Sequence, residues 1–167
     1  MNASTNKVAQ KLQMSSSGFT LIELMVTIAV LAIIVSVAAP NISTQLANQR
    51  VKSTTATLAN ALKEAKAESV IRRQNVTLSY DNSSSPKKIV ITASDTNSSV
   101  IASYNYNAQS NIKPIATTSI TFAPSKRIIS IDDITYTICD SNASATSRQI
   151  EVDRVANITS RMGGKCS

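Results

Sequence analysis

Few side chains in this chain are suited to chemistry, and they are widely spaced. The 167 residues include no histidine, and the two cysteines are Cys139 and Cys166. Asp132 and Asp133 are adjacent carboxylates, and neighbours on a β-strand point to opposite faces of a sheet. They cannot act together as a general acid and base, so we interpret them as a turn between two strands. Because the cysteine spacing also fits no zinc motif, we expect no catalytic site, no metal site and no cofactor.

The two cysteines are better suited to a covalent cross-link. Both lie in the C-terminal third, beyond the apolar segment described below. If this part is exported, a disulfide is the expected state; two unpaired thiols are the alternative if it stays in the cytosol. A bridge would close a loop of about 28 residues and stabilise the fold by roughly 3–4 kcal/mol.

Glu23 is the one charge in an otherwise apolar segment, residues 19–39. At about 1.5 Å rise per residue, a helix over this segment covers roughly 30 Å, the thickness of a bilayer core. A carboxylate at this position is costly in lipid. Either it reaches the nearby interface, or it pairs with a positive group on a neighbouring subunit. A free amino terminus created by cleavage at Gly18 would supply that group.

The apolar segment is preceded by a polar leader, residues 1–18, which holds Lys7, Lys11 and no acidic residue. The positive-inside rule places this leader in the cytoplasm and the C-terminal part outside. A secretory signal cleaved near residues 36–39 is the alternative. Against it, the apolar run is longer than an ordinary signal core and continues into a helical pattern, interrupted only by Pro40.

The elements that follow predict an α+β domain. Residues 41–74 have apolar or small residues at spacings of three and four, which predicts a helix that lies on its own sheet and is kinked at Pro40. After residue 75 the period becomes two, which predicts an antiparallel β-sheet over residues 76–167. The helical stripe consists of Val51, Thr55, Leu58, Leu62, Ala65 and Ser69. The expected strands are 76–80, 88–93, 99–104, 118–122, 126–131, 134–138 and 148–155.

The residues around Glu23 resemble a known processing motif. The segment Ser17-Gly18-Phe19-Thr20-Leu21-Ile22-Glu23-Leu24 is similar to the prepilin cleavage motif of type IV pilins and type II secretion pseudopilins. The resemblance implies that prepilin peptidase cuts between Gly18 and Phe19 and that Phe19 becomes N-methylated. Glu23 is then the fifth mature residue, and Pro40 stands where the family commonly has a proline; both are expected to act in assembly.

The C-terminal part resembles the GspH/FimT family of minor pilins and pseudopilins. The resemblance rests on Ile120-Thr121-Phe122-Ala123-Pro124 and on the Cys139–Cys166 pair, which is similar to the terminal disulfide loop of FimU-like minor pilins. It implies a pilin-like fold: a leader (1–18), a transmembrane assembly helix (19–40) and a periplasmic domain (41–167). The implied function is a minor pilin of a type IV pilus in the bacterial inner membrane, assembling with other pilins. A type II secretion pseudopilin H subunit is the alternative.

A DNA-binding minor pilin is a further alternative, because the chain has a formal net charge of +7. Some FimT-type pilins carry Gly-Arg-x-Arg in the tail, and this tail has no such sequence. No aromatic residue accompanies the basic ones to stack on bases. The candidate phosphate contacts are Lys126, Arg127, Arg154, Arg161 and Lys165.

Overall fold

The computed structural model describes residues 18–96, 98–114 and 119–166. The predicted leader, apart from Gly18, lies outside these residues. The chain divides into two compact units, residues 1–39 and 40–167, and each is described by itself. One helix, α1 (Leu21–Arg72), contributes to both units.

In the first unit, α1 begins at a capped N-terminus. The backbone N–H of Glu23 donates to Thr20 Oγ1 at 3.2 Å, so Thr20 caps the helix and Glu23 lies in its first turn. The hydroxyls of Thr27 and Ser36 donate to backbone carbonyls within the helix, at 2.8 and 2.7 Å. Such internal bonds satisfy these polar groups without help from water.

In the second unit, the predicted helical stripe is confirmed: all six of its residues are buried in the structure. The buried hydroxyl of Thr55 donates to the Val51 carbonyl at 2.7 Å, and that of Ser69 to the Lys66 carbonyl at 2.7 Å. The helix ends at Arg72, and Arg73 follows with a φ of 54°. A single left-handed residue of this kind commonly ends a helix.

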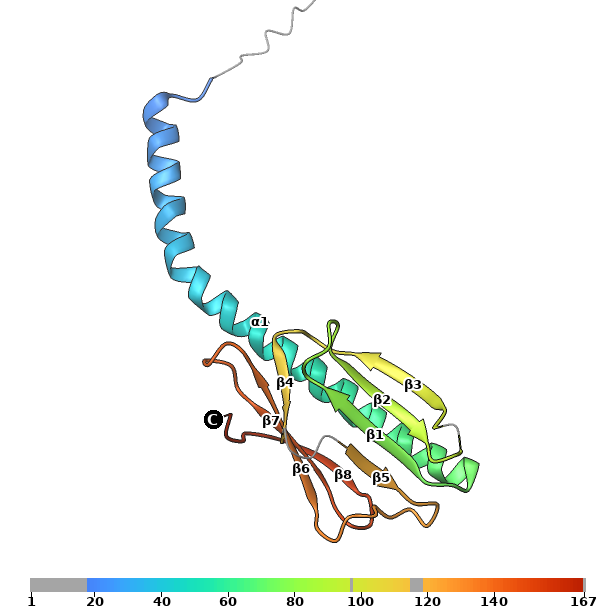
Figure 1. The fold of residues 1–167 in the computed structure, drawn as a ribbon. Helices are drawn as coiled ribbons and strands as arrows, with labels where there is room; N and C mark the ends of the chain where they lie inside the picture. The colour runs from blue at the N-terminus through green and yellow to red at the C-terminus, as the bar shows by residue number, and fades with distance from the viewer. Residues whose placement is uncertain (1–17, 97, 115–118, 167) are drawn as a thin grey trace, which may run out of the picture. The chain divides into compact units, whose positions relative to one another are not determined.

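The strands form two antiparallel sheets of four strands each (Figure 1). The first has the order β3-β2-β1-β5, and the second has the order β4-β6-β7-β8. The first sheet comprises β1 (Val76–Asp81), β2 (Lys88–Ala93), β3 (Val100–Asn105) and β5 (Ser119–Phe122). The second comprises β4 (Ser110–Lys113), β6 (Ile134–Asp140), β7 (Arg148–Val152) and β8 (Ile158–Met162).

The α+β class is confirmed, with α1 and both sheets contributing to one core. Its largest fully buried side chains include Tyr136, Phe122 and Leu58, which come from the second sheet, the first sheet and α1. Asn82 joins the two sheets: its amide donates to the Ile112 carbonyl at 2.9 Å and accepts from the Ile112 N–H at 3.0 Å. The turn after β1 is thereby fixed to β4.

Three strand predictions were wrong in detail. Residues 126–131 are not a strand: Lys126 has a φ of 62°, and only Ile128 makes an isolated bridge, to Phe122. The predicted strand 148–155 ends at Val152, because the chain turns and returns as β8, which was missed. The short strand β4 was also missed. Its four residues, Ser-Asn-Ile-Lys, contain a single large apolar side chain and so give little β-signal.

Candidate functional site

The most conspicuous functional feature is the apolar surface of α1 in the first unit. Every described side chain from Gly18 to Val37 is exposed, and Phe19 and Val37 expose 82% and 74% of their surface. A continuous apolar surface of this size marks contact with lipid or protein. No single helix in the described residues meets the length and hydropathy required to cross a bilayer. The segments Leu21–Val37 and Ile42–Arg72 meet them together, by length and composition only.

Glu23 lies at the capped end of this surface. It is the third residue of α1, one turn from Phe19, and its side chain is exposed. Within residues 18–37, the structure records no ion pair for its carboxylate. The Thr20 cap holds the first turn in helical form, so the carboxylate is presented from an ordered backbone. Its charge also suits the positive end of the helix dipole.

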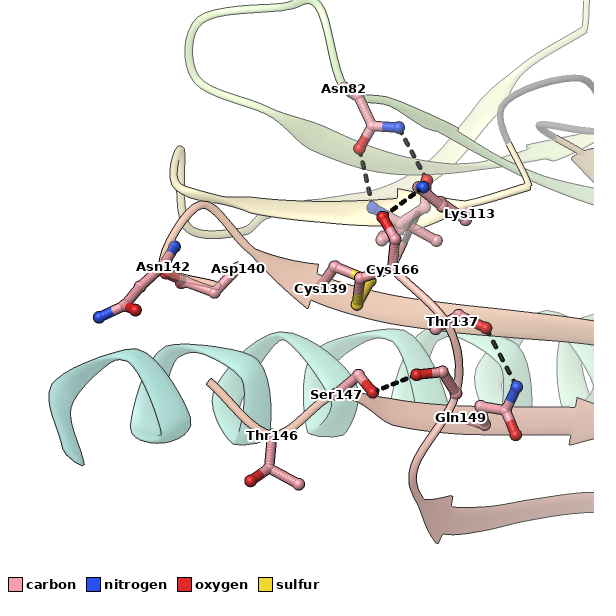
Figure 2. Close-up of a disulfide and its surroundings, with 12 residues drawn as sticks. Asn82, Lys113, Thr137, Cys139, Asp140, Asn142, Thr146, Ser147, Gln149 and Cys166 are labelled. Carbon is pink, nitrogen blue, oxygen red and sulfur yellow. Dashed lines mark hydrogen bonds between the residues drawn. A yellow bond between two sulfur atoms is a disulfide. The ribbon is translucent and has the colours of Figure 1, made fainter. Parts of the chain in front are cut away.

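The second feature is the C-terminal tail, which is fastened across the second sheet. The expected disulfide is present: Cys139 and Cys166 are bonded, with their Cα atoms 5.8 Å apart (Figure 2). Before it, the Gly163 N–H donates to the Ser147 carbonyl at 2.9 Å, and Ser147 Oγ donates to the Gly164 carbonyl at 2.7 Å. Lys113 Nζ donates to the Cys166 carbonyl at 2.7 Å. We call residues 163–166 the C-terminal strap.

Two glycines allow the strap to pack closely against β6 and β7. Gly163 and Gly164 have φ angles of 106° and 117°, which side chains rarely permit. A Cβ at Gly164 would lie 2.8 Å from both Gln149 Cγ and Thr137 Cγ2, whereas a Cβ at Gly163 would have open space. The side chain of Gln149 is itself bonded to Thr137 Oγ1 at 3.2 Å (Figure 2). Close packing of the strap on β6 and β7 therefore requires glycine at 164.

An ion pair connects α1 to the end of β6, beside the disulfide. Arg50 Nε and NH2 donate to the two carboxylate oxygens of Asp140, each at 2.9 Å. The Asp140 side chain is fully buried, and the Asn142 N–H donates to it at 3.0 Å. The bond from Arg50 lowers the pKa of Asp140, and the same bond raises the pKa of Arg50. Sequence reasoning missed this pair, since the partners are far apart in the chain.

The candidate DNA-contact residues do not form one group. Lys126 lines a hollow with the C-terminal end of α1, and Arg127 and Arg154 line a second hollow, where the Ile128 N–H donates to the Arg154 carbonyl at 3.3 Å. Arg161 lies on β8 and pairs with Glu151 at 3.2 Å, while Lys165 belongs to the strap. The five predicted residues therefore occupy separate places on the second unit.

The carboxylates Asp132 and Asp133 lie in a bend before β6, outside any strand. Asp133 Oδ1 accepts a bond from the Arg154 N–H at 3.1 Å, which is a structural role in a loop. Among the described residues, no group of three or more acidic, histidine or cysteine side chains is placed to hold a metal ion.

An exposed apolar helix with an acidic first turn, followed by a disulfide-closed α+β unit, defines a pilin-like protein. Residues 13–39 match the prokaryotic N-terminal methylation motif, which indicates a membrane-anchored N-terminal helix. Residues 54–156, more than half of the chain, match the family described as type II transport protein GspH. The chain therefore belongs to the GspH family of pilins and pseudopilins, whose members assemble with other pilin-like subunits in a filament.

Solved structures have the same fold. The type IV minor pilin FimU of Pseudomonas aeruginosa aligns with a TM-score of 0.59 at 18% identity, covering 71% of this chain and 96% of that one. The minor pseudopilin EpsH of the Vibrio cholerae type 2 secretion system aligns with a TM-score of 0.53 at 7% identity, covering 70% and 99%. Among curated protein sequences, none matches this chain.

Proposed function

We propose that this chain is a minor pilin of a type IV pilus, cut by prepilin peptidase between Gly18 and Phe19 and N-methylated on Phe19. One observation carries the proposal. The uncovered apolar surface, which continues along α1, begins at Phe19, the residue that cleavage would make the new amino terminus. A helix of this kind must find lipid before assembly and other subunits after it.

The topology follows from the charges and the disulfide. Lys7 and Lys11 keep the leader, residues 1–18, in the cytoplasm, and the apolar part of α1, within residues 19–40, spans the inner membrane once. Residues 41–167 then form the periplasmic domain. The Cys139–Cys166 bond supports this placement, because structural disulfides persist in oxidising compartments. The division of the chain into two compact units after residue 39 supports the same boundary.

Assembly relies on the first turn of α1. Cleavage leaves an ammonium group on Phe19, and Glu23 of an adjacent subunit neutralises it in an environment of low dielectric. An unpaired carboxylate there is costly, so pairing favours one axial register between neighbouring subunits. Pro40 serves assembly by adapting the helix at the membrane boundary, since proline removes one backbone hydrogen bond.

The terminal disulfide and the positive charge favour the pilus over type II secretion, where the same subunit design would serve as the pseudopilin H. Deleting the gene in its native host separates the two functions. Loss of surface pili with normal protein secretion supports the minor pilin. Normal pili with loss of secreted enzymes from the medium supports the pseudopilin.

DNA uptake is a second candidate, and its support comes from Lys126, Arg127 and Arg154, which lie near one another. It predicts duplex binding that weakens steeply with salt and is lost when these three residues become Ala. Binding that is instead lost on substituting Arg161 and Lys165 would assign the contact to the tail.

Intact mass of the protein from native membranes tests the main proposal. We expect a chain that starts at Phe19, carries one added methyl group and gains two hydrogens on reduction. A chain that starts at Met1 or near residue 40 would refute processing at Gly18 and the pairing of Glu23 with Phe19.

A further inference from the structure

A surface at the C-terminal end of α1 combines unpaired positive charge with exposed aliphatic side chains. It consists of two hollows, one lined in part by Lys126 and the other by its chain neighbour Arg127, which together we call the α1-end surface. The first is lined by Lys63, Lys66, Ala67, Val70, Ile71 and Lys126. The second is lined by Arg127, Ile128, Ser130, Arg154 and Val155. Both belong to the second unit and involve no residue of the apolar segment.

The two hollows are held together by defined contacts. Ser69 Oγ lies 3.2 Å from the Ala123 carbonyl, which fixes the segment after β5 to α1. Lys66 Nζ donates to the Ala156 carbonyl at 2.7 Å, which fixes the loop between β7 and β8 to the same end of the helix. Figure 1 shows the segment after β5 beside this end of α1. The surface is therefore part of the folded unit.

Four of the cations on this surface have no recorded ion pair in the part of the chain that the structure describes. Within the described residues, no ion pair or side-chain hydrogen bond is recorded for Lys63, Lys126, Arg127 or Arg154. Three neighbouring acids accept hydrogen bonds from other groups, and only Glu68 is in an ion pair. Glu68 pairs with Arg72 at 2.6 Å, Asp133 accepts from the Arg154 N–H, and Asp153 accepts from the Asn157 N–H at 2.8 Å. The bond from Asn157 lowers the pKa of Asp153.

Both hollows also expose aliphatic side chains. Ile71 exposes 72% of its surface, Val70 is exposed in the same hollow, and Val155 is exposed in the other. Exposed aliphatic residues beside basic ones suit a protein partner, in which carboxylates meet the cations and apolar side chains cover the aliphatic ones. Nucleic acid would leave these aliphatic side chains without a partner, and none of the lining residues is aromatic. A second copy docked symmetrically would bring like charges together.

We propose that the α1-end surface binds an acidic protein segment that carries aliphatic side chains between its carboxylates. The cations attract and orient the segment, and Val70, Ile71 and Val155 bury its apolar side chains. The site is independent of leader cleavage and of assembly through α1, so it stands or falls separately from the proposed function.

The test uses the full chain in nanodiscs of zwitterionic phosphatidylcholine and fluorescein-labelled helical peptides of about 18 residues. The acidic probe has a leucine stripe flanked by glutamates. One comparison peptide replaces the glutamates with lysines, and another replaces the leucines with serines. A 20-base-pair DNA duplex is the fourth probe. Anisotropy gives each Kd at two salt concentrations, and sedimentation reports self-association.

Two variants separate charge from apolar contact. The double substitution Lys126→Glu with Arg127→Glu is expected to weaken binding of the acidic probe at least ~10-fold. Ile71→Ser is expected to weaken it about 5-fold. The matched control, Lys52→Glu with Lys88→Glu, changes the net charge equally at exposed positions away from the surface and should leave the Kd unchanged.

Charge-swap rescue guards against misfolding: the lysine peptide should bind the Lys126→Glu, Arg127→Glu variant and not the unaltered chain. The proposal is overturned if the acidic probe does not bind, or binds the control and the double variant equally. It is also overturned if the serine peptide binds as tightly as the leucine peptide. If the DNA duplex binds with a Kd that Ile71→Ser leaves unchanged, the surface binds nucleic acid instead. If the chain self-associates and both Ile71→Ser and the Lys126→Glu, Arg127→Glu variant abolish this, the surface is a contact between copies.

Discussion

The C-terminal strap allows a paired test of close packing, because its two glycines share a positive φ but differ in the space around them. Gly163 and Gly164 both have positive φ angles, yet only a Cβ at 164 would meet other atoms, at 2.8 Å. An alanine at either position introduces backbone strain of about 1–3 kcal/mol, reduced by about 0.4–1 kcal/mol because the unfolded chain loses freedom. At 164, crowding against Gln149 and Thr137 adds about 1–3 kcal/mol.

We therefore expect Gly163→Ala to lower the free energy of unfolding by about 1 kcal/mol and Gly164→Ala by about 3 kcal/mol. The assay is equilibrium urea unfolding of the full chain in zwitterionic micelles. Tyrosine fluorescence reports it, since the chain has four Tyr and no Trp. Non-reduced intact mass confirms that each variant has formed its disulfide.

The same pair of substitutions in a Cys139→Ser, Cys166→Ser background completes the test. Without the disulfide the strap can detach from β6 and β7 at little cost. The difference between the two alanine variants should then fall below about 0.5 kcal/mol, the limit of additivity for independent sites. Equal losses for the two variants in the disulfide-bonded chain would refute the packing at Gly164. If the two alanine variants differ in stability by as much without the disulfide as with it, the disulfide does not hold the strap in place.

The remaining predictions concern the disulfide, the Arg50–Asp140 ion pair and Glu23. Cys139→Ser with Cys166→Ser should lower the free energy of unfolding by about 3.5 kcal/mol, since the bond spans 27 residues; a loss under about 1 kcal/mol in urea titrations would contradict this. Asp140→Asn should cost about 2–4 kcal/mol at pH 7, because Arg50 loses its charged partner. The pKa of Asp140 is lowered in the fold, so its contribution is present above the unfolded pKa of about 3.9 and is lost as pH falls through the folded pKa. The unaltered chain and Asp140→Asn should therefore converge in stability once the pH falls below the folded pKa of Asp140, and curves that stay parallel throughout an acid titration would exclude the ion pair as the cause. Glu23→Gln should be cut and methylated normally yet appear in sheared pili at roughly a tenth or less of the usual amount, by immunoblot against Glu64→Gln as control.

Sequence reasoning succeeded where residue type and spacing along the chain are enough to predict the structure. The helical stripe from Val51 to Ser69 was predictable because burial repeats with the period of the helix. The disulfide was expected on the ground that only two cysteines exist and both follow the apolar segment. The residues around Gly18 and Glu23 indicated the methylation motif because that motif is a short, contiguous run of the chain.

It failed where the outcome depends on pairs of distant residues. Arg50 lies 90 residues from Asp140 in the chain, and nothing in the sequence near either residue points to the other. Strand β8, with its sequence Ile-Thr-Ser-Arg-Met, exists because β7 lies alongside it, residue by residue, from Val152 to Arg148. The run from Lys126 to Ile131 has strand-like composition, but Lys126 has a positive φ and the chain turns there.

The Arg50–Asp140 ion pair also provides one path by which the domain can bear mechanical load. Asp140 follows Cys139, so a pull on α1 at Arg50 passes through two hydrogen bonds to β6 and then through a covalent bond to Cys166. The C-terminal strap is thus connected to the part of α1 near Arg50 through one ion pair and one disulfide. Subunits with an intact disulfide should therefore yield at higher force than reduced ones.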